Sequence, residues 1–429
     1  MEFKGYRKLF GKLEMEKGLL KIAMGAIILL MTLTGVSLAA TDLASAFKEG
    51  KISGNIRTYY FARNFDGTKT DKEDLAVGGV LNAKTAPLKG FSAGVGFKTS
   101  QGADWNDDDK GVYGLLAKDE NKDHENYTAL HQYYLQYKGY DTTVKLGAQY
   151  IDTPWLNRHN NRLTPNSYRA LSIVNKSISK VKLYGYYVDE IMKKAGTEFL
   201  SMSESISSKI TEDKSVLVGG IVWKPSGTLK IQLWDYYAED LYNMAYLRTD
   251  YSYKLSKDYT LLAGLRLFKQ DDIGDALAGK IETYMAGGSV GLKAYGAKLD
   301  LLYGQIGDDG LVMTWGHDKI IAQQINGSQK AEGDSFGVKV SYDFGKIDLK
   351  GLSAYVYYAQ HNTPDSGVNA SQDIDEIDFN LKYKFGGSLK GLSLRLRHAI
   401  IDEDEALNGD EALNGIDYSD TRVYLQYKF

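Results

Sequence analysis

Basic residues at even spacings recur near both ends of this 429-residue chain, six positions apart at 57 and 63 and two apart at 382/384 and 395/397. In an extended strand, side chains at positions i and i+2 point to the same face, about 7 Å apart, so each such pair would present two cations to one side. Arg keeps its charge at physiological pH, and its planar guanidinium can hold a carboxylate with two donors. The chemistry on offer is therefore weak, serial binding of anionic groups. The residues of this predicted basic row are Arg57, Arg63, Lys382, Lys384, Arg395, Arg397 and Arg422.

A second polar group lies in the segment 152–167, which contains Pro154 and Pro165. Prolines stiffen the backbone, as a loop that must hold its shape inside a channel requires. His159 is expected to line a polar surface rather than to bind a metal, because no second ligand stands at helical or strand spacing from it. An exposed outer loop is the alternative. The residues predicted to form a constriction are Asp152, Pro154, Trp155, Arg158, His159, Asn161 and Arg162.

Motifs for catalysis or cofactor binding are absent from the sequence. There is no Gly-x-Ser-x-Gly elbow, no His-Glu-x-x-His and no phosphate loop. Without Cys there is no thiol chemistry and no Cys-ligated metal. A net charge of −3 does not suit a nucleic-acid-binding protein. We therefore expect no enzyme, no cofactor, no bound metal and no nucleic-acid partner.

The elements that must position these residues are predicted to be β-strands. Apolar and polar residues alternate in many segments, among them 52–63, 91–99, 144–150, 377–386 and 392–397. A period of two without a competing helical period indicates strands with two different faces. The plentiful Gly (45) and Tyr (32) and the scarce Pro (5) suit many strands with tight turns and aromatic girdles.

Connection lengths predict how these strands are joined. Short turns at 87–90, 139–142, 225–228 and 388–391 interleave with long polar loops near 101–126, 151–167, 192–214, 307–334, 362–374 and 402–417. Short turns on one side and long outer loops on the other are typical of bacterial outer-membrane barrels. We predict an all-β fold: a transmembrane antiparallel β-barrel of about 18 strands enclosing an aqueous channel.

Both ends of the chain carry export and assembly signals. Residues 1–39 are predicted to be a signal peptide, because a basic leader precedes an apolar run at 22–36 and small residues follow at a cleavage site. Met15 is a possible alternative start. Residues 40–429 would then form the barrel domain. The last strand ends on Phe429, which resembles the signal read by the outer-membrane assembly machinery.

Three segments resemble the OprD-like outer-membrane porins of Gram-negative bacteria. They read ISGNIRTYYFARNF, AVGGVLNAKTAPLKGFSAGVGFKTS and KLGAQYIDTPWLNRHNNRLTPNSYRA. They lie within roughly the first 170 residues, and the remainder matches in strand rhythm only. The resemblance implies eighteen strands, a third loop folded inward and a basic row that guides solutes bearing a carboxylate. Asn161 departs from the Asp expected in many relatives, which leaves the charge of the constriction open.

Barrel closure would gather the basic row on one wall, because the first strand then neighbours the last. Arg248 and Arg266 also face inward by parity, on a distant wall. The expected function is passive diffusion of small polar solutes, favouring carboxylates such as amino acids or small organic acids. Expected partners are lipid, lipopolysaccharide and the assembly machinery, and a homotrimer is one possible assembly.

The sequence leaves three other functions open. In a non-selective general porin, the basic residues would only solvate the wall and pair with acidic loops. An outer-membrane barrel lipase would need Ser and His on the lipid-facing wall, for which parity offers only His131 and His398. An adhesin or plugged barrel would need a plug or passenger domain, and no spare segment of that size exists.

Overall fold

The chain folds into one large antiparallel sheet. The computed structural model describes residues 40–103, 106, 111–112, 114–118, 123–408, 411–413 and 415–429. The predicted signal peptide at 1–39 lies outside the described residues. Eighteen long strands cross the wall, so the predicted barrel of about 18 strands is confirmed.

The first nine of these strands belong to the N-terminal half of the chain. They are β1 (Lys51–Phe65), β2 (Lys72–Lys84), β3 (Phe91–Gly102), β6 (Tyr127–Gly139), β7 (Thr142–Gln149), β8 (Ser167–Asn175), β9 (Val181–Met192), β11 (Val216–Trp223) and β12 (Leu229–Ala238).

The other nine complete the circuit. They are β13 (Tyr242–Lys254), β14 (Tyr259–Asp272), β15 (Glu282–Ala294), β16 (Ala297–Ile306), β17 (Asp334–Asp343), β18 (Leu352–Asn362), β19 (Ile374–Lys384), β20 (Leu392–Glu403) and β23 (Tyr418–Lys428).

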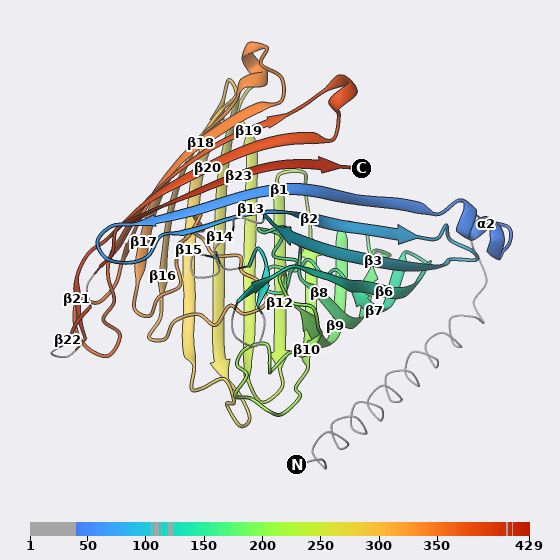
Figure 1. Cartoon of the computed structure of the whole chain (residues 1–429), viewed down its shortest axis with the longest axis horizontal. Helices are drawn as coiled ribbons and strands as arrows, with labels where there is room; N and C mark the ends of the chain where they lie inside the picture. The colour runs from blue at the N-terminus through green and yellow to red at the C-terminus, as the bar shows by residue number, and fades with distance from the viewer. Residues whose placement is uncertain are drawn as a thin grey trace.

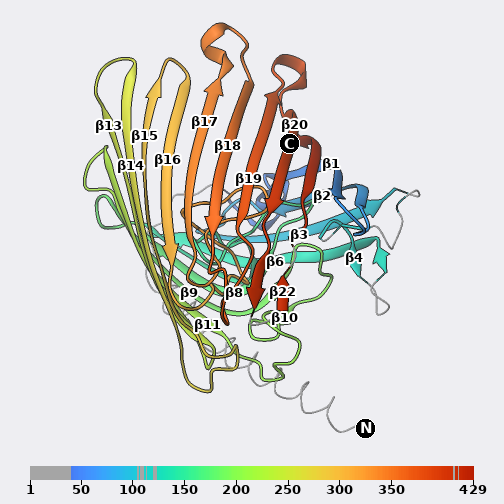
Figure 2. The ribbon, with the colours of Figure 1, turned by 90° about the vertical axis from the view of Figure 1, so that its left-hand side faces the viewer.

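Each long strand pairs with its neighbours in sequence, and β1 pairs with β23 to close the barrel. Figure 1 shows β1 and β23 side by side. The C-terminus lies at the end of the barrel where the short turns connect the strands, such as the turn at 388–391 (Figure 2). We call this the turn end, and the opposite end the loop end. Closure leaves no unpaired sheet edge, which a bilayer would penalise.

Short helices and strands lie in the connections and at the ends of the chain. The α-helix α2 (Leu43–Lys48) is capped by Asp42, whose side chain accepts from the Ser45 amide. The 3₁₀-helices η2 (Phe344–Ile347) and η3 (Gly387–Leu389) lie in turns. The short strands are β4 (Ala117–Lys118), β5 (His124–Glu125), β10 (Leu200–Ser201), β21 (Ala406–Asn408) and β22 (Glu411–Leu413).

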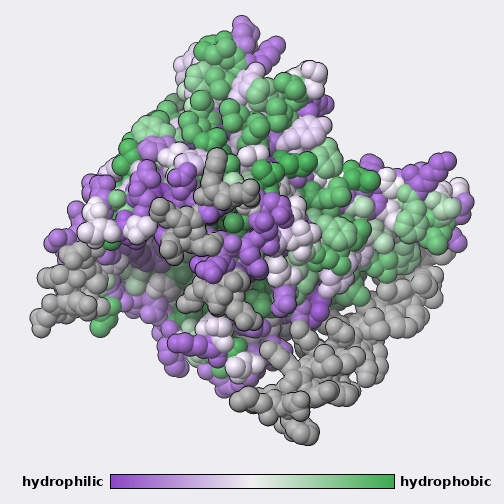
Figure 3. All heavy atoms as spheres, in the orientation of Figure 1, coloured by the Kyte–Doolittle hydropathy of each residue, from purple (hydrophilic) through white to green (hydrophobic). Residues whose placement is uncertain are grey.

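The two faces of the wall differ as the alternation predicts. On β14, Leu261, Leu265 and Leu267 are exposed outward, whereas Arg266 and Phe268 face the interior. Hydrophobic side chains gather over the outer wall in Figure 3, and exposed Tyr residues recur near both strand ends, as in aromatic girdles. None of the helices in the described part of the chain is long and apolar enough to span a membrane.

A β-bulge in β6 breaks the predicted parity at His131. The pairing of β3 with β6 shifts between Gly96 and Phe97, so that Gly96 pairs with Gln132 and Phe97 with Leu130. The extra residue is His131, which is fully buried. A bulge inserts one residue and reverses the alternation beyond it. The expectation that His131 faces lipid is therefore wrong.

Candidate functional site

The third loop-end connection (150–166, L3) folds into the barrel, as predicted. Its anchor is Trp155, which is 1% exposed and packs 4.4 Å from the ring of Phe268 on β14. Tyr246 on β13 contacts the same indole edge-on. The Trp155 amide donates to the hydroxyl of Tyr236 at 3.2 Å. L3 starts at β7, so this anchor carries it across the lumen.

The far part of L3 rests on the opposite wall. Leu163 is buried in an apolar cluster with Tyr59, Phe61 and Tyr424. Arg57 donates to the carbonyl of Arg162, whose guanidinium lies over the Phe61 ring. L3 is thus held at both ends and divides the lumen.

Polar residues at the start of L3 stabilise its turn. Asp152 forms an ion pair with Arg158 at 2.7 Å, so the charge of Arg158 is compensated locally. Arg158 also lies over the ring of Tyr150. The side-chain amide of Asn157 donates to the carbonyl of Pro154 at 3.1 Å. Within L3 these contacts fix the loop shape rather than leave a free charge.

His159 faces a second histidine that spacing alone could not reveal. His317, from the connection between β16 and β17, packs edge-on at 5.0 Å. Burial and nearby cations, chiefly Lys194, lower the pKa of His159 to about 3. Burial likewise lowers the pKa of His317 to about 4. Both rings are neutral at physiological pH. Among the described residues, no group of three or more potential ligands could hold a metal.

The connection 307–333 (L7) also folds inward, which corrects the expectation of an outer loop. Trp315 is 1% exposed and packs against Tyr242, and its indole donates to Ser205 of the connection 193–215 (L4) at 2.8 Å. Tyr168 donates to the carbonyls of Trp315 and Asn157. A Trp and an Ile320–Ile321 pair are unusual in an exposed polar loop. They were the signal in the sequence that could have indicated an inward fold of L7.

The tip of L7 reaches the wall formed by β19 and β23. The amide of Gln324 donates to Asp378 at 2.9 Å, and its side chain donates to Asp420 at 2.7 Å. Glu376 accepts from the amides of Ile325 and Asn326. Three inward carboxylates thereby hold one loop tip, so L7 spans the lumen as L3 does.

The seven residues of the predicted basic row all lie on the inner face of four adjacent strands. On β19–β20, Lys382 pairs in register with Arg395, and Asn380 with Arg397. Arg397 pairs in turn with Arg422 on β23. Three further members lie on the same wall. They are Lys384 on β19, and Arg57 and Arg63 on β1. We call this set the basic wall.

Carboxylates compensate part of the basic wall. Asp420 is fully buried and forms ion pairs with Arg63 at 2.9 Å and Arg422 at 2.6 Å. Arg395 donates to the amide oxygen of Asn380 at 2.6 Å. Among the described residues, no carboxylate lies within ion-pair distance of Arg395 or Arg397. The uncompensated charge of the wall is therefore centred on β20 and β19.

Two arginines on the distant wall have a partner from L7. Asp318 accepts from Arg248 at 2.6 Å and from Arg266 at 3.3 Å. Tyr246 donates to the same carboxylate at 2.9 Å. The sequence places both arginines inward but gives no sign of this partner, which comes from a loop 70 residues away from Arg248.

Two lysines of the inward loops were not predicted. Lys194 of L4 donates to the side-chain oxygen of Asn161 at 3.1 Å. Burial, with Arg162 and Arg422 nearby, lowers the pKa of Lys194 to about 7. Lys319 of L7 donates to Gln329 at 2.5 Å, and burial lowers its pKa to about 8. Asn161 thus offers Lys194 a neutral oxygen where an Asp would offer a charge.

These two lysines predict a pH-dependent constriction. An ammonium group loses its proton as pH rises through its pKa, so the constriction loses up to about two positive charges between about pH 6 and about pH 9. Anion preference, measured as a reversal potential across a planar bilayer, should fall over this range. The double variant K194R/K319R keeps its charge and should flatten the profile. An unchanged profile in that variant would exclude these lysines as the cause.

The positions of the histidines do not support a lipid-facing active site. His131 is buried inside the wall, and the outward His398 lies 2.9 Å from the hydroxyl of Thr421. A Ser–His pair does exist, with Ser335 2.8 Å from His361, but Ser335 is 3% exposed. His361 also contacts Gln323 at 3.1 Å, so the pair supports L7.

Comparison with protein-family models gives one match over most of the chain. Residues 45–429 match the model of the outer membrane porin, OprD family. None of the curated protein sequences compared matches this chain significantly.

Solved structures with the same fold are plentiful. Pseudomonas aeruginosa OccK1 (OpdK) has a TM-score of 0.77 at 20% identity, covering 89% of this chain and 99% of its own. Pseudomonas aeruginosa OccK9 (OpdG) has a TM-score of 0.78 at 21% identity, with coverages of 90% and 99%. Acinetobacter baumannii OccAB2 has 0.77 at 22% identity, also with 90% and 99%.

Proposed function

Because this chain belongs to the OprD family of outer membrane porins, we propose that its channel favours small solutes bearing a carboxylate, such as amino acids or small organic acids. As a porin of the outer membrane it passes small polar solutes by passive diffusion, and its family is not one of enzymes. The solute preference is the new step, and it depends on the charge of the lumen.

The observation that carries this proposal is the basic wall. Arg395 and Arg397 stand two residues apart on β20, with Lys382 and Arg422 as their respective register partners. The wall thus offers a carboxylate several cations at neighbouring positions, not one deep site. Transit requires that a solute can also leave, and weak serial binding meets this condition.

The expected interaction energies between a solute carboxylate and the cations of the basic wall are small enough to allow the solute to pass. An exposed ion pair contributes about 0–1 kcal/mol, so each cation would hold a solute only briefly. Arg can hold a carboxylate with two donors. Screening over about 8 Å at physiological ionic strength predicts that added salt weakens the preference. One similar structure, Pseudomonas aeruginosa OpdK, was solved with vanillate, an aromatic carboxylate.

A general porin is the second candidate, and one observation favours it. Asp420 compensates Arg63 and Arg422, and Glu376 and Asp378 face the same part of the lumen. If these acids cancel the field of the basic wall, selection by size alone would remain.

Removal of charge from β20 separates the two candidates. In the double variant R395Q/R397Q, we expect uptake of small carboxylates into liposomes to fall roughly fivefold, since two contacts of about 0.5 kcal/mol each are lost. Uptake of uncharged sugars should stay nearly unchanged. The variant R395K/R397K, which keeps the charge, should retain most of the carboxylate uptake. If carboxylates and sugars slow equally, the general porin is the better description.

Partners of the outer surface follow from the same membrane location. We propose that the loop end contacts lipopolysaccharide and that the assembly machinery reads the terminal strand. Homotrimer formation stays a prediction.

A further inference from the structure

A cavity of about 740 Å³ lies beneath L7, outside the strands that carry the basic wall. Its roof is formed by L7 residues 318–320 and 322, and its lining extends down to the turn 224–228 between β11 and β12. The strands β12 to β18 contribute its walls. We call this space the lower chamber. It is polar, and most of its charged residues fall into two groups, with Lys224 at the turn and Lys319 in the roof outside them.

The first group combines three cations with two carboxylates. Arg248 forms ion pairs with Asp250 at 2.9 Å and with Asp318 at 2.6 Å, and Arg266 shares Asp318 at 3.3 Å. Lys230 lines the same region. Among the described residues, no carboxylate lies within 4.0 Å of its ammonium. This group therefore has a net charge of one positive unit.

The second group combines two cations with one carboxylate. Lys298 forms an ion pair with Asp300 at 2.7 Å. Lys339 lies over the rings of Tyr355 at 4.0 Å and Tyr357 at 5.0 Å. In the described part of the chain, no carboxylate comes within ion-pair distance of Lys339. This group also keeps one uncompensated cation.

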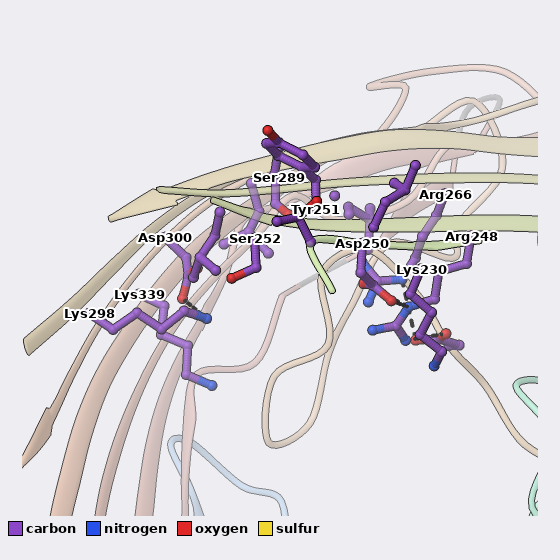
Figure 4. Close-up of a pocket in the computed structure, with 18 of the residues that line it drawn as sticks. Lys230, Arg248, Asp250, Tyr251, Ser252, Arg266, Ser289, Lys298, Asp300 and Lys339 are labelled. Atoms are coloured by element: carbon purple, nitrogen blue, oxygen red, sulfur yellow. Dashed lines mark hydrogen bonds and ion pairs between the residues drawn. The ribbon is translucent and has the colours of Figure 1, made fainter. Parts of the chain in front are cut away.

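The two groups face each other across the chamber. Figure 4 shows Lys298, Asp300 and Lys339 on one side, and Lys230, Arg248 and Arg266 on the other, with Ser252 between them. Lys319 adds a further ammonium to the roof. The chamber thus presents two separated cationic ends joined by a stretch with hydroxyl groups.

We propose that the lower chamber is a second binding station, which selects dianions whose two carboxylates are separated by a spacer long enough to reach both ends. Lys230 on β12 and Lys339 on β17 stand five strand steps apart, which at about 4.8 Å per step is roughly 24 Å along the sheet. One carboxylate would meet Lys230 beside Arg248, and the other Lys339 beside Lys298. A monoanion can satisfy only one end. A compact dianion, with both charges on one centre, cannot reach both. This inference rests on the proposed function only in requiring an anion pathway through the same lumen.

The strand register connects the chamber with the basic wall. Tyr355, under Lys339, pairs in register with Asn380 on β19. Asn380 pairs in turn with Arg397. Lys339 on β17 is therefore separated from Arg397 on β20 by two strands, β18 and β19. A carboxylate released at Arg397 finds its next cation in the chamber.

Planar-bilayer recordings with suberate (an eight-carbon dicarboxylate), propionate and inorganic phosphate would test this station. Suberate should reduce the chloride current at lower concentration than either propionate or phosphate. The variants K230Q and K339Q should each raise the suberate concentration for half-maximal reduction about fivefold, and should leave propionate nearly unchanged. The matched control K145Q removes an inward lysine on β7 outside the chamber and should not change the suberate response.

Heat-modifiability on gels and a normal open-channel conductance would show that each variant has assembled. Equal responses to suberate in K230Q, K339Q and K145Q would overturn the proposal. So would a phosphate response as strong as that of suberate. The carboxylate preference fails separately, if R395Q/R397Q leaves propionate entry unchanged while K230Q and K339Q still weaken the suberate response.

Discussion

Deletion of Phe429 is expected to lower the amount of protein in the outer membrane roughly tenfold or more. The residue closes the seam of the barrel, because its amide and carbonyl both form hydrogen bonds with Gly54 of β1, at 3.2 and 3.1 Å. Its ring stacks on Tyr427 and lies over Gly54, where a Cβ would come within 3.0 Å of the ring. Unpaired backbone groups are costly in lipid, so loss of this residue weakens the closing pair.

The variant F429D distinguishes recognition of the terminal residue by the assembly machinery from stabilisation of the closed barrel. Its backbone can still pair with Gly54, and an acidic residue near the membrane interface costs only about 0–1 kcal/mol. A large fall in surface level would therefore point to a failure in assembly. Q426A, which changes an inward residue of the same strand, is the control and should be far less affected. Equal surface levels for F429D and Q426A would contradict the role of Phe429 as an assembly signal.

The substitution W155A should release L3 and open the constriction. Truncation of a buried Trp to Ala costs about 3–5 kcal/mol, and such a change shifts a docked–undocked equilibrium by about a hundredfold or more. Trp155 is the anchor that holds L3 against Phe268 and Tyr246. We expect a higher single-channel conductance with more open-channel noise, and a weaker preference for carboxylates over sugars.

The matched control is W223A. Trp223 lies on β11, faces outward and is 45% exposed, so its loss leaves L3 docked. W223A should keep the conductance of the unmodified channel. If W155A also keeps it, Trp155 does not hold the constriction, and contacts at the other end, such as Leu163, must suffice.

The barrel and its basic wall could be predicted because both depend on local periodicity. Alternation with period two assigns each residue to a face, as with Arg395 and Arg397 inward and Leu394 and Leu396 outward. The bilayer then requires closure, since it leaves no solvent for an open edge. Closure brings Arg57 and Arg422 onto one wall although 365 positions separate them in the printed sequence. The Pro-bracketed segment that contains Trp155 similarly indicated a constrained third loop.

Only the tertiary structure decided which charges remain available. Gln324 reaches Asp420 over 96 residues, Arg248 reaches Asp318 over 70, and neither pairing follows from any period in the sequence. The bulge at His131 reversed the alternation because one inserted residue exchanges the two faces. The sequence predicts an outer loop at L7, and this is wrong because the conformation of a loop depends on shape and charge complementarity with distant walls. The sequence determined which residues face the lumen, whereas the packing of the inward loops determined which of them can still bind a solute.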